Sequence, residues 1–338
     1  MKDISVFWGA NTAEGFFSLA EEAAASLAPK RVFIVKGSAG CGKSGLMTRV
    51  AEEAARKGEA VIRILCSGDP DSLDGVCLPD RGVLFFDGTA PHVMEPTLTG
   101  ETGFYVDLSR FFLRPAEGLA VLERAYREHY RRAYCCLAAA GSMGEVLRCP
   151  PKAAEAVARR AGSLAVRSLR KRPGRGRVFR CFTDAFTCRG PVSLPDTRRQ
   201  LAPKLISLTG DRARADVFLR TALDAVVERG YDAILCPDPV EPRLAAHLLV
   251  PAAGLGFTVG EGDRRIHLEK LGKPPTEAEK AEYREVRRLR EELLARAQAE
   301  LALAKAEHDR LEAAVHPCID FAAVTGETER ILRSVFAE

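Results

Sequence analysis

The chain has 338 residues, which is longer than one ordinary domain, so we expect two packed units. Hydrophobic residues make up 46% of the sequence and charged residues 28%, a balance that excludes wholesale disorder. The 50 basic and 46 acidic residues nearly cancel, and a net charge of +4 does not by itself imply a nucleic-acid partner.

No apolar run approaches the roughly 20 residues that a membrane-spanning helix needs. The N-terminal residues lack the basic and apolar regions of a signal peptide. We therefore expect a cytoplasmic protein without a membrane partner. The ten cysteines are scattered and form no C-x-x-C pair, which favours reduced thiols over a structural metal site.

The first predicted strand–loop–helix unit carries a glycine-rich loop. The apolar strand at 32–35 is followed by residues that fit the Walker A pattern G-x-x-x-x-G-K-S, namely Gly37, Ser38, Ala39, Gly40, Cys41, Gly42, Lys43 and Ser44. Glycines bring backbone N–H groups against phosphate oxygens, and the N-terminus of the following helix attracts the same anion. Lys43 is expected to reach the β- and γ-phosphates, and the Ser44 hydroxyl to ligate Mg²⁺. The alternative is a glycine-rich turn with a solvated lysine.

An acidic sequence, DPDSLDG, follows the second predicted strand. Loops beyond the carboxyl ends of parallel strands line the ligand crevice of an α/β sheet. Asp69, Asp71 and Asp74 are therefore candidates to bind magnesium or to accept hydrogen bonds from a second substrate. Ordinary turn and helix-capping chemistry is the alternative interpretation.

The third predicted strand, 83–86, is apolar and leads into Asp87. An acid at this place usually holds the magnesium of a phosphate loop, directly or through water, so Asp87 is predicted to be a metal ligand and catalytic residue. Because Asp-Gly is also a turn signal, an aspartate that only begins a turn is the alternative. Gly88 stands where many ATP-hydrolysing proteins carry a glutamate that polarises water. His92 is the nearest candidate for a γ-phosphate contact or proton transfer, or else it fixes its loop by hydrogen bonds.

A basic stretch follows the next predicted helix, 119–140. Residues 159–180 include nine basic residues and no acidic one, and the stretch contains KRPGRGR, which we interpret as a linker. This places the domain boundary near residue 174, with domains at 1–174 and 175–338. The stretch could follow nucleic-acid phosphates or supply arginine fingers to the triphosphate. We favour a solvated linker face, because no aromatic residue suited to base stacking occurs in it before Phe179.

The second half repeats the first at a nearly constant spacing. The matched positions are Gly37 with Gly210, Gly58 with Gly230, Asp69-Pro70 with Asp238-Pro239, Pro79 with Pro251, and Val6-Phe7 with Val178-Phe179. Alternating strands and helices predict an α/β protein of two duplicated P-loop NTPase-like domains, with parallel sheets and helical extensions.

The second half lacks the phosphate-binding residues. It keeps Gly210, but Asp216 is predicted to take the place of Lys43, and Val259 that of Asp87. Acidic groups at a phosphate cradle repel the ligand. The second half is therefore predicted to be a degenerate copy that supports, covers or regulates the first.

A long helix is predicted from Thr276, which would cap it together with Glu279. Its apolar stripe comprises Val286, Leu289, Leu293, Ala297 and Leu301. We favour helix-on-helix packing within the protein over a coiled coil with a partner, because the stripe is rich in alanine and breaks near His316-Pro317.

Four sequences in one order suggest a family. GANTAEGF at 9–16, KGSAGCGKS at 36–44, CSGDPDSLDGV at 66–76 and DGTAPHV at 87–93 together resemble a family of poorly characterised bacterial proteins, mostly from Firmicutes, described as P-loop ATPases or nucleotide-kinase-like proteins. The resemblance covers both halves and implies a tandem P-loop fold. The site residues that it implies are Gly37, Gly42, Lys43, Ser44, Asp69, Asp74, Asp87 and His92. It implies no particular substrate.

Taken together, these patterns predict a magnesium-dependent ATP-binding protein with ATPase activity at one site. One alternative is a kinase that transfers the γ-phosphoryl group to a small molecule or nucleotide. Another is a nucleotide-gated module that holds a partner through the basic stretch or the C-terminal helices. No N-K-x-D sequence occurs, which gives a slight preference for ATP over GTP.

Overall fold

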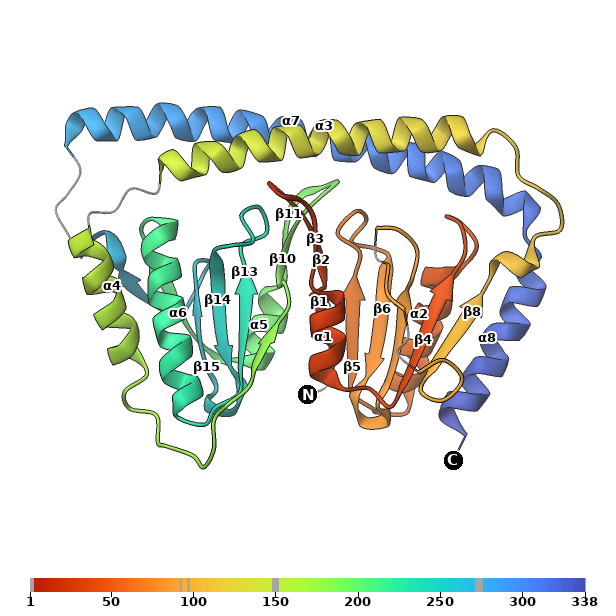
Figure 1. The fold of residues 1–338 in the computed structure, drawn as a ribbon, viewed down its shortest axis with the longest axis horizontal. Coiled ribbons are helices and arrows are strands. Elements are labelled where there is room, and N and C mark those ends of the chain that lie inside the picture. Colours follow the sequence, from red (N-terminus) through yellow and green to blue (C-terminus); the bar gives the residue numbers. More distant parts are fainter. Residues whose placement is uncertain (1–2, 92, 96–97, 148–151, 271–275, 338) are drawn as a thin grey trace.

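The computed structural model describes residues 3–91, 93–95, 98–147, 152–270 and 276–337. Two α/β halves lie side by side, and a pair of long helices bridges them at one end (Figure 1). Within the described residues, no helix is both long and apolar enough to cross a membrane.

The first half is built on a six-stranded sheet of order β1-β5-β6-β7-β4-β8. Its strands are β1 (Asp3–Phe7), β4 (Arg31–Lys36), β5 (Val61–Leu65), β6 (Leu73–Leu78), β7 (Val83–Asp87) and β8 (Gly103–Asp107). The sheet is mixed and not parallel as predicted, because β6 runs antiparallel to both neighbours. Residues 66–72 join β5 to β6, whereas a parallel return needs a crossover of about a dozen residues or more.

The second half has the same topology, read from the opposite edge, with the order β16-β12-β15-β14-β13-β9. Its strands are β9 (Val178–Arg180), β12 (Lys204–Thr209), β13 (Ala233–Pro237), β14 (Ala245–Val250), β15 (Leu255–Thr258) and β16 (Arg264–His267). Here β14 is the antiparallel strand. Each half also carries a hairpin, formed by β2 (Gly9–Thr12) with β3 (Gly15–Ser18) and by β10 (Asp184–Thr187) with β11 (Gly190–Ser193).

Backbone pairing corrects two of the sequence matches. Phe7 and Phe182 exchange both backbone hydrogen bonds where the halves meet, so Phe182 and not Phe179 is the counterpart of Phe7. Likewise, Cys66 N donates to Ser72 O as Asp238 N donates to Leu244 O. Asp238 is therefore the counterpart of Cys66, and the match of Asp69-Pro70 with Asp238-Pro239 is wrong.

The incorrect match of Asp69-Pro70 with Asp238-Pro239 has a physical cause. The carboxylate of Asp69 accepts from the backbone N–H of Asp71, and that of Asp238 from the backbone N–H of Val240. Both residues begin Asx turns, so the same two letters recur at different places in equivalent loops.

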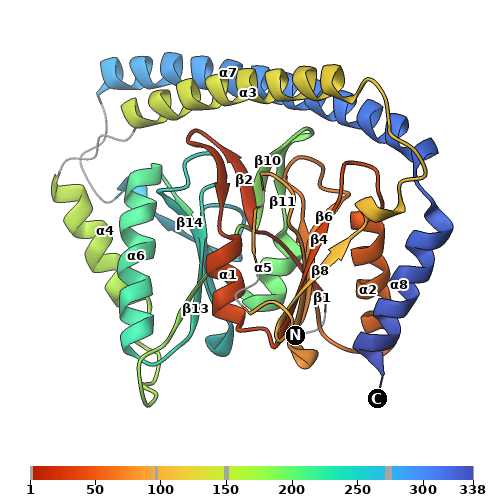
Figure 2. The ribbon, with the colours of Figure 1, turned by 45° about the vertical axis from the view of Figure 1, so that its right-hand side comes forward.

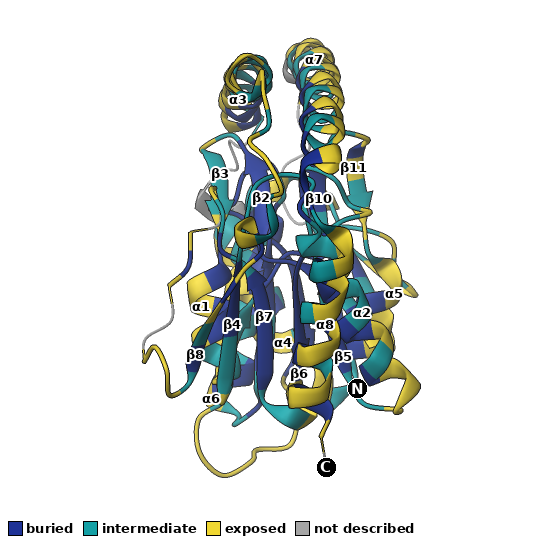
Figure 3. Cartoon of the chain, turned by 90° about the vertical axis from the view of Figure 1, so that its right-hand side faces the viewer, coloured by how far each residue is buried: buried dark blue, intermediate teal, exposed yellow. Residues whose placement is uncertain are grey.

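Helices cover both faces of each sheet. In the first half these are α1 (Ala20–Leu27) on one face and α2 (Lys43–Arg56) on the other, and the central strand β6 and most of β7 are buried (Figure 3). In the second half they are α5 (Pro195–Leu201) and α6 (Arg212–Glu228). Short 3₁₀ helices lie at Pro79–Arg81, Ser109–Phe111, Pro251–Ala253, Leu268–Lys270 and His316–Cys318.

The bridge consists of α3 (Leu119–Val146) and α7 (Glu277–Val315), which run antiparallel across both halves (Figure 2). Ala133 and Leu137 of α3 pack against Ala297 and Leu301 of α7 in one buried cluster, which is the helix-on-helix packing that we expected. Leu289, however, is 45% exposed, so the predicted stripe drifts off the buried face toward the start of α7. The side chain of Glu279 lies outside the described residues, and its capping role stays a prediction.

Each bridge helix is followed by a further helix that packs on the opposite half. After α3, the chain forms α4 (Lys152–Ala165), which packs on α6 of the second half. After α7, it forms α8 (Phe321–Phe336), which packs on α2 of the first half. Val324, Ile331 and Val335 of α8 are buried in the core of the first half. The two halves thus exchange their outer helices.

Candidate functional site

The loop between β4 and α2 folds as a tight cradle. Gly37, Gly40 and Gly42 all have positive φ angles, of 148°, 75° and 97°. At Gly40 a Cβ atom would lie 2.9 Å from the Cα of Glu312, so α7 approaches the loop too closely for any side chain. Glycine is therefore required here by both the backbone conformation and the contact with the bridge.

Lys43 is the first residue of α2, and its ammonium group folds over the loop. Its Nζ donates to the carbonyl oxygens of Gly37 and Ser38, at 2.8 and 3.0 Å. The same Nζ lies 3.7 Å from Oδ2 of Asp87, at the end of β7. The sequence-predicted lysine and acid thus converge on one side of the loop.

Asp87 makes the turn that one of its two interpretations predicts, and its role as a metal ligand stays a prediction. Its Oδ1 accepts from the backbone N–H and the hydroxyl of Thr89, which is turn chemistry, while its Oδ2 faces Lys43. The Ser44 hydroxyl accepts from the backbone N–H of Leu73 at 3.0 Å and so ties α2 to β6. His92 lies outside the described residues, and its contact with a γ-phosphate stays a prediction.

The three acids after β5 are separated by the structure. Asp71 is exposed and pairs with Arg189 of the second half. Asp69 pairs with Lys305 of α7 at 3.3 Å and lines a cavity that opens on the loop. Asp74 lines the same cavity, but it lies in β6 and not in a loop as predicted, and it is only 5% exposed.

This loop cavity has a volume of about 250 Å³. Lys43, Ser44, Asp69, Asp74 and Asp87 line it from the first half. The bridge and the chain that follows it supply further lining residues that the sequence reasoning missed, namely Tyr126, Tyr130, Lys305, His308, Glu312, His316 and Phe321. Their spacing, at intervals of three or four residues on α3 and α7, is the signal that they share a helix face.

Burial changes the protonation of several of these groups. Desolvation raises the pKa of the Tyr126 hydroxyl to about 12, and it also raises the pKa of the Cys66 thiol. Burial lowers the pKa of His308, with Glu312 opposing the shift and Lys305 adding to it. His308 is therefore neutral at pH 7 and can donate or accept a hydrogen bond.

The basic stretch does not reach this cavity. None of its nine residues, all of them described, lines the loop cavity. Instead, Arg177 pairs with Asp232, Arg180 pairs with Glu22 of the first half, and Arg172 stacks on Tyr231. The arginine-finger alternative gains no support from these contacts.

The described residues of the second half form no equivalent cradle. Helix α6 begins at Arg212, and Asp211 caps it by accepting from the backbone N–H of Arg214 at 2.8 Å. The first turn of α6 thus occupies the chain that forms the loop in the first half. Val259 is the residue after β15, and it corresponds to Asp87, the last residue of β7. The correspondence holds because β15 pairs with β14 in the register in which β7 pairs with β6.

Asp216 takes the place of Ser44 and not of Lys43 as predicted. Its carboxylate accepts from the backbone N–H of Ala245, the first residue of β14, just as Ser44 accepts from Leu73, the first residue of β6. Asp216 is one residue closer to Gly210 than Ser44 is to Gly37. A sequence alignment on the two glycines therefore places Asp216 opposite Lys43 and not opposite Ser44.

The sequence reasoning also missed a buried polar cluster in the second half. His247 lies between Thr258, at 2.7 Å from its Nδ1, and Asp184, which contacts its Nε2. Arg198 donates to Asp184 at 2.7 Å. The cluster joins β10 and α5 to the sheet, and burial lowers the pKa of His247.

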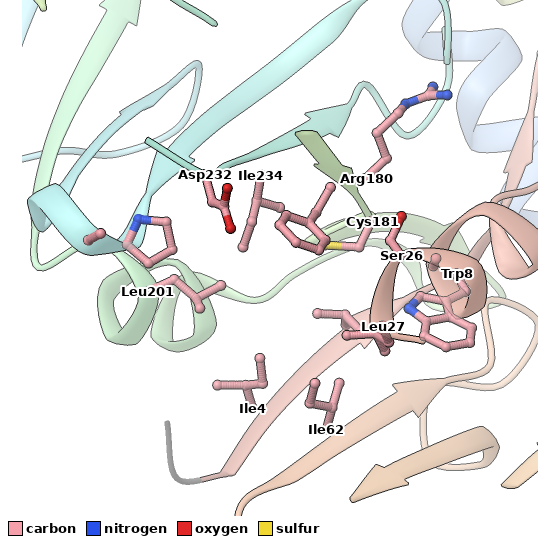
Figure 4. Close-up of a pocket in the computed structure, with 15 residues that line it drawn as sticks. Ile4, Trp8, Ser26, Leu27, Ile62, Arg180, Cys181, Leu201, Asp232 and Ile234 are labelled. Atoms are coloured by element: carbon pink, nitrogen blue, oxygen red, sulfur yellow. The ribbon is translucent and has the colours of Figure 1, made fainter. Parts of the chain in front are cut away.

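A second cavity, of about 300 Å³, lies between the two halves (Figure 4). Its lining atoms are almost all apolar, from residues such as Ile4, Trp8 and Ile62 on one side and Leu201 and Ile234 on the other. The charged residues in its wall, Arg180 and Asp232, are already ion-paired. The smaller loop cavity therefore holds the chemistry, and we take it as the candidate site.

Comparison of the chain with protein-family models, with curated proteins and with solved structures gives no match.

Proposed function

We propose that this chain is a cytoplasmic, magnesium-dependent ATPase of the P-loop type, with one nucleotide site in the first half and a degenerate copy in the second. The observation that carries the proposal is the convergence of Lys43 and Asp87, 3.7 Å apart, beside a glycine loop at the start of α2. An ammonium group, a carboxylate and a ring of backbone N–H groups are the parts that a triphosphate site requires.

The residues would divide the work by their chemistry. The Ser44 hydroxyl and the Asp87 carboxylate are oxygen ligands of the kind that Mg²⁺ prefers. When bound, the ion neutralises charge on the β- and γ-phosphates. Lys43 would leave its carbonyl partners to reach the same oxygens, while the loop amides hold the anion and α3 and α7 limit access of water to the cavity.

The test is phosphate release from ATP in the presence of Mg²⁺. We expect Lys43→Ala to abolish release, because the ammonium group of Lys43 is the one that donates to the loop carbonyls of Gly37 and Ser38. The matched control is Lys57→Ala, which changes a lysine at the opposite end of α2. Equal turnover by the Lys43→Ala variant and the unmodified protein would refute the proposal.

A kinase is the second candidate, and one observation favours it. Asp69 and Asp74 face the same cavity as Lys43, where an acceptor hydroxyl could be oriented by a carboxylate. We expect Asp69→Asn to slow transfer to the true acceptor in a screen with labelled ATP, while Asp71→Asn, at the exposed acid, leaves it nearly unchanged. If no acceptor receives label faster than water does, the ATPase remains the better proposal.

A further inference from the structure

Charged and aromatic side chains both line the loop cavity. Asp74 of β6, Asp87 of β7 and Lys305 of α7 supply charged groups. Tyr126 and Tyr130 of α3, and His316 and Phe321 at the junction of α7 with α8, supply aromatic rings. A nucleoside triphosphate also has both kinds of group, because a charged polyphosphate is joined through a sugar to a flat aromatic base.

Phe321 is not accounted for by core packing. The side chains of Val324, Ile331 and Val335 on the same helix are buried, whereas Phe321 is 39% exposed. Its ring meets His316 edge to face, with the ring centroids 5.2 Å apart and the planes at 81°. This contact orients the ring, while 39% of the side chain remains exposed.

The ring lies against the start of α2. Its Cε1 is 3.9 Å from the position that a Cβ on Gly42 would take, and Gly45 in the first turn of α2 lines the same cavity. Lys43 and Ser44 are the residues expected to engage the β- and γ-phosphates and the metal. An aromatic group beside the loop, on an element separate from the acids, is suitably placed for the base.

We propose that Phe321, positioned by His316, is a stacking platform for the nucleobase, so that the ligand is a nucleoside triphosphate and not inorganic polyphosphate. This inference rests on the proposed function and adds to it the residue that receives the nucleobase. It also gives the exchanged helix α8 a direct part in the site of the first half. Stacking is tolerant of base identity, so ATP and GTP would both bind.

The experiment is calorimetric titration of the full chain with ATP and, separately, with inorganic tripolyphosphate, both with Mg²⁺. Phe321→Ala is expected to weaken ATP binding about 5- to 100-fold and to leave tripolyphosphate affinity unchanged. Phe321→Leu keeps the apolar volume and should lose ATP affinity in the same way, whereas Phe321→Tyr should retain it. Leu303→Ala, at an exposed position of α7 outside the loop cavity, is the matched control.

Two results would overturn the platform alone. In one, Phe321→Ala binds ATP as tightly as the unmodified protein; in the other, it loses both ligands equally, which would indicate a structural role. If the unmodified protein binds neither ATP nor tripolyphosphate, the proposed function fails together with the platform.

Discussion

Gly40 is the residue at which the loop and the bridge meet. Its φ of 75° is costly for any residue with a Cβ, and that Cβ would approach the backbone of Glu312. Gly58 has the same φ of 75° but open space around it. A comparison of variants at the two glycines therefore distinguishes the effect of backbone strain, which both positions share, from the effect of the contact with α7, which Gly40 makes and Gly58 does not.

We expect Gly40→Ala to lower the free energy of unfolding by more than Gly58→Ala. The shared cost of left-handed backbone is about 1–2 kcal/mol, and at Gly40 the displaced helix adds to it. Urea denaturation of both variants measures the difference, and ATP titration should show weaker binding for Gly40→Ala alone. Equal destabilisation of the two variants would contradict a close contact between α7 and the loop.

His308 gives the site a dependence on pH at the same scale. Because burial lowers its pKa below the usual 6.5, the unfolded chain binds the proton more readily than the folded one. Its contribution to stability is therefore present above pH 6.5 and lost as the pH falls below that value. We expect His308→Gln to flatten the fall in unfolding free energy between pH 7 and pH 5, measured by denaturant titration at each pH. An unchanged slope would show that His308 titrates alike in both states.

At the scale of elements, the first turn of α6 explains why the second half does not form a glycine loop like that of the first half. It occupies the chain that would have to form a cradle, and the carboxylates of Asp211 and Asp216 are already engaged by the backbone N–H groups of Arg214 and Ala245. We expect one ATP per chain in calorimetric titration, and none for Lys43→Ala. A stoichiometry of two would mean that α6 unwinds its first turn to bind a second nucleotide.

How far the sequence predicts these elements depends on whether the signal is local. The loop after β4, the acid ending β7 and the long helix from Thr276 follow from spacing and apolar pattern, and the structure places them there. Strand β6 was missed, because its residues LDGVCL mix acid and glycine with apolar residues and it follows a turn rather than a helix. The site residues on α7 were missed for a different reason, since nothing local shows which loop a distant helix will touch.

At the scale of the whole molecule, the exchange of α4 and α8 is the feature that sequence could not supply. An amphipathic pattern predicts that a helix covers a sheet, but after a duplication both sheets offer an equivalent face. The choice depends on the length and direction of α3 and α7, which carry the chain across the molecule before each outer helix begins.

The exchange leads to a prediction about fragments. Residues 1–174 alone would lack α8, leaving the side of the core that packs Val324, Ile331 and Val335 open to water. We expect this fragment to aggregate when produced alone and to bind ATP when produced together with residues 175–338. Size-exclusion chromatography and ATP titration measure both properties. A soluble 1–174 fragment that binds ATP with full affinity would contradict the dependence on α8.

The continuous length of α7 has a mechanical consequence. With 39 residues and a rise of about 1.5 Å per residue, it is about 58 Å long, starts over the second half and ends beside Gly40. A bound phosphate group that displaces the loop at Gly40 would also displace α7 near its C-terminal end, at Glu312. Because α3 contacts α7 from Arg290 to His308, and Arg290 pairs with Glu241 of the second half, a displacement of α7 at Glu312 would be passed along the two helices to the second half.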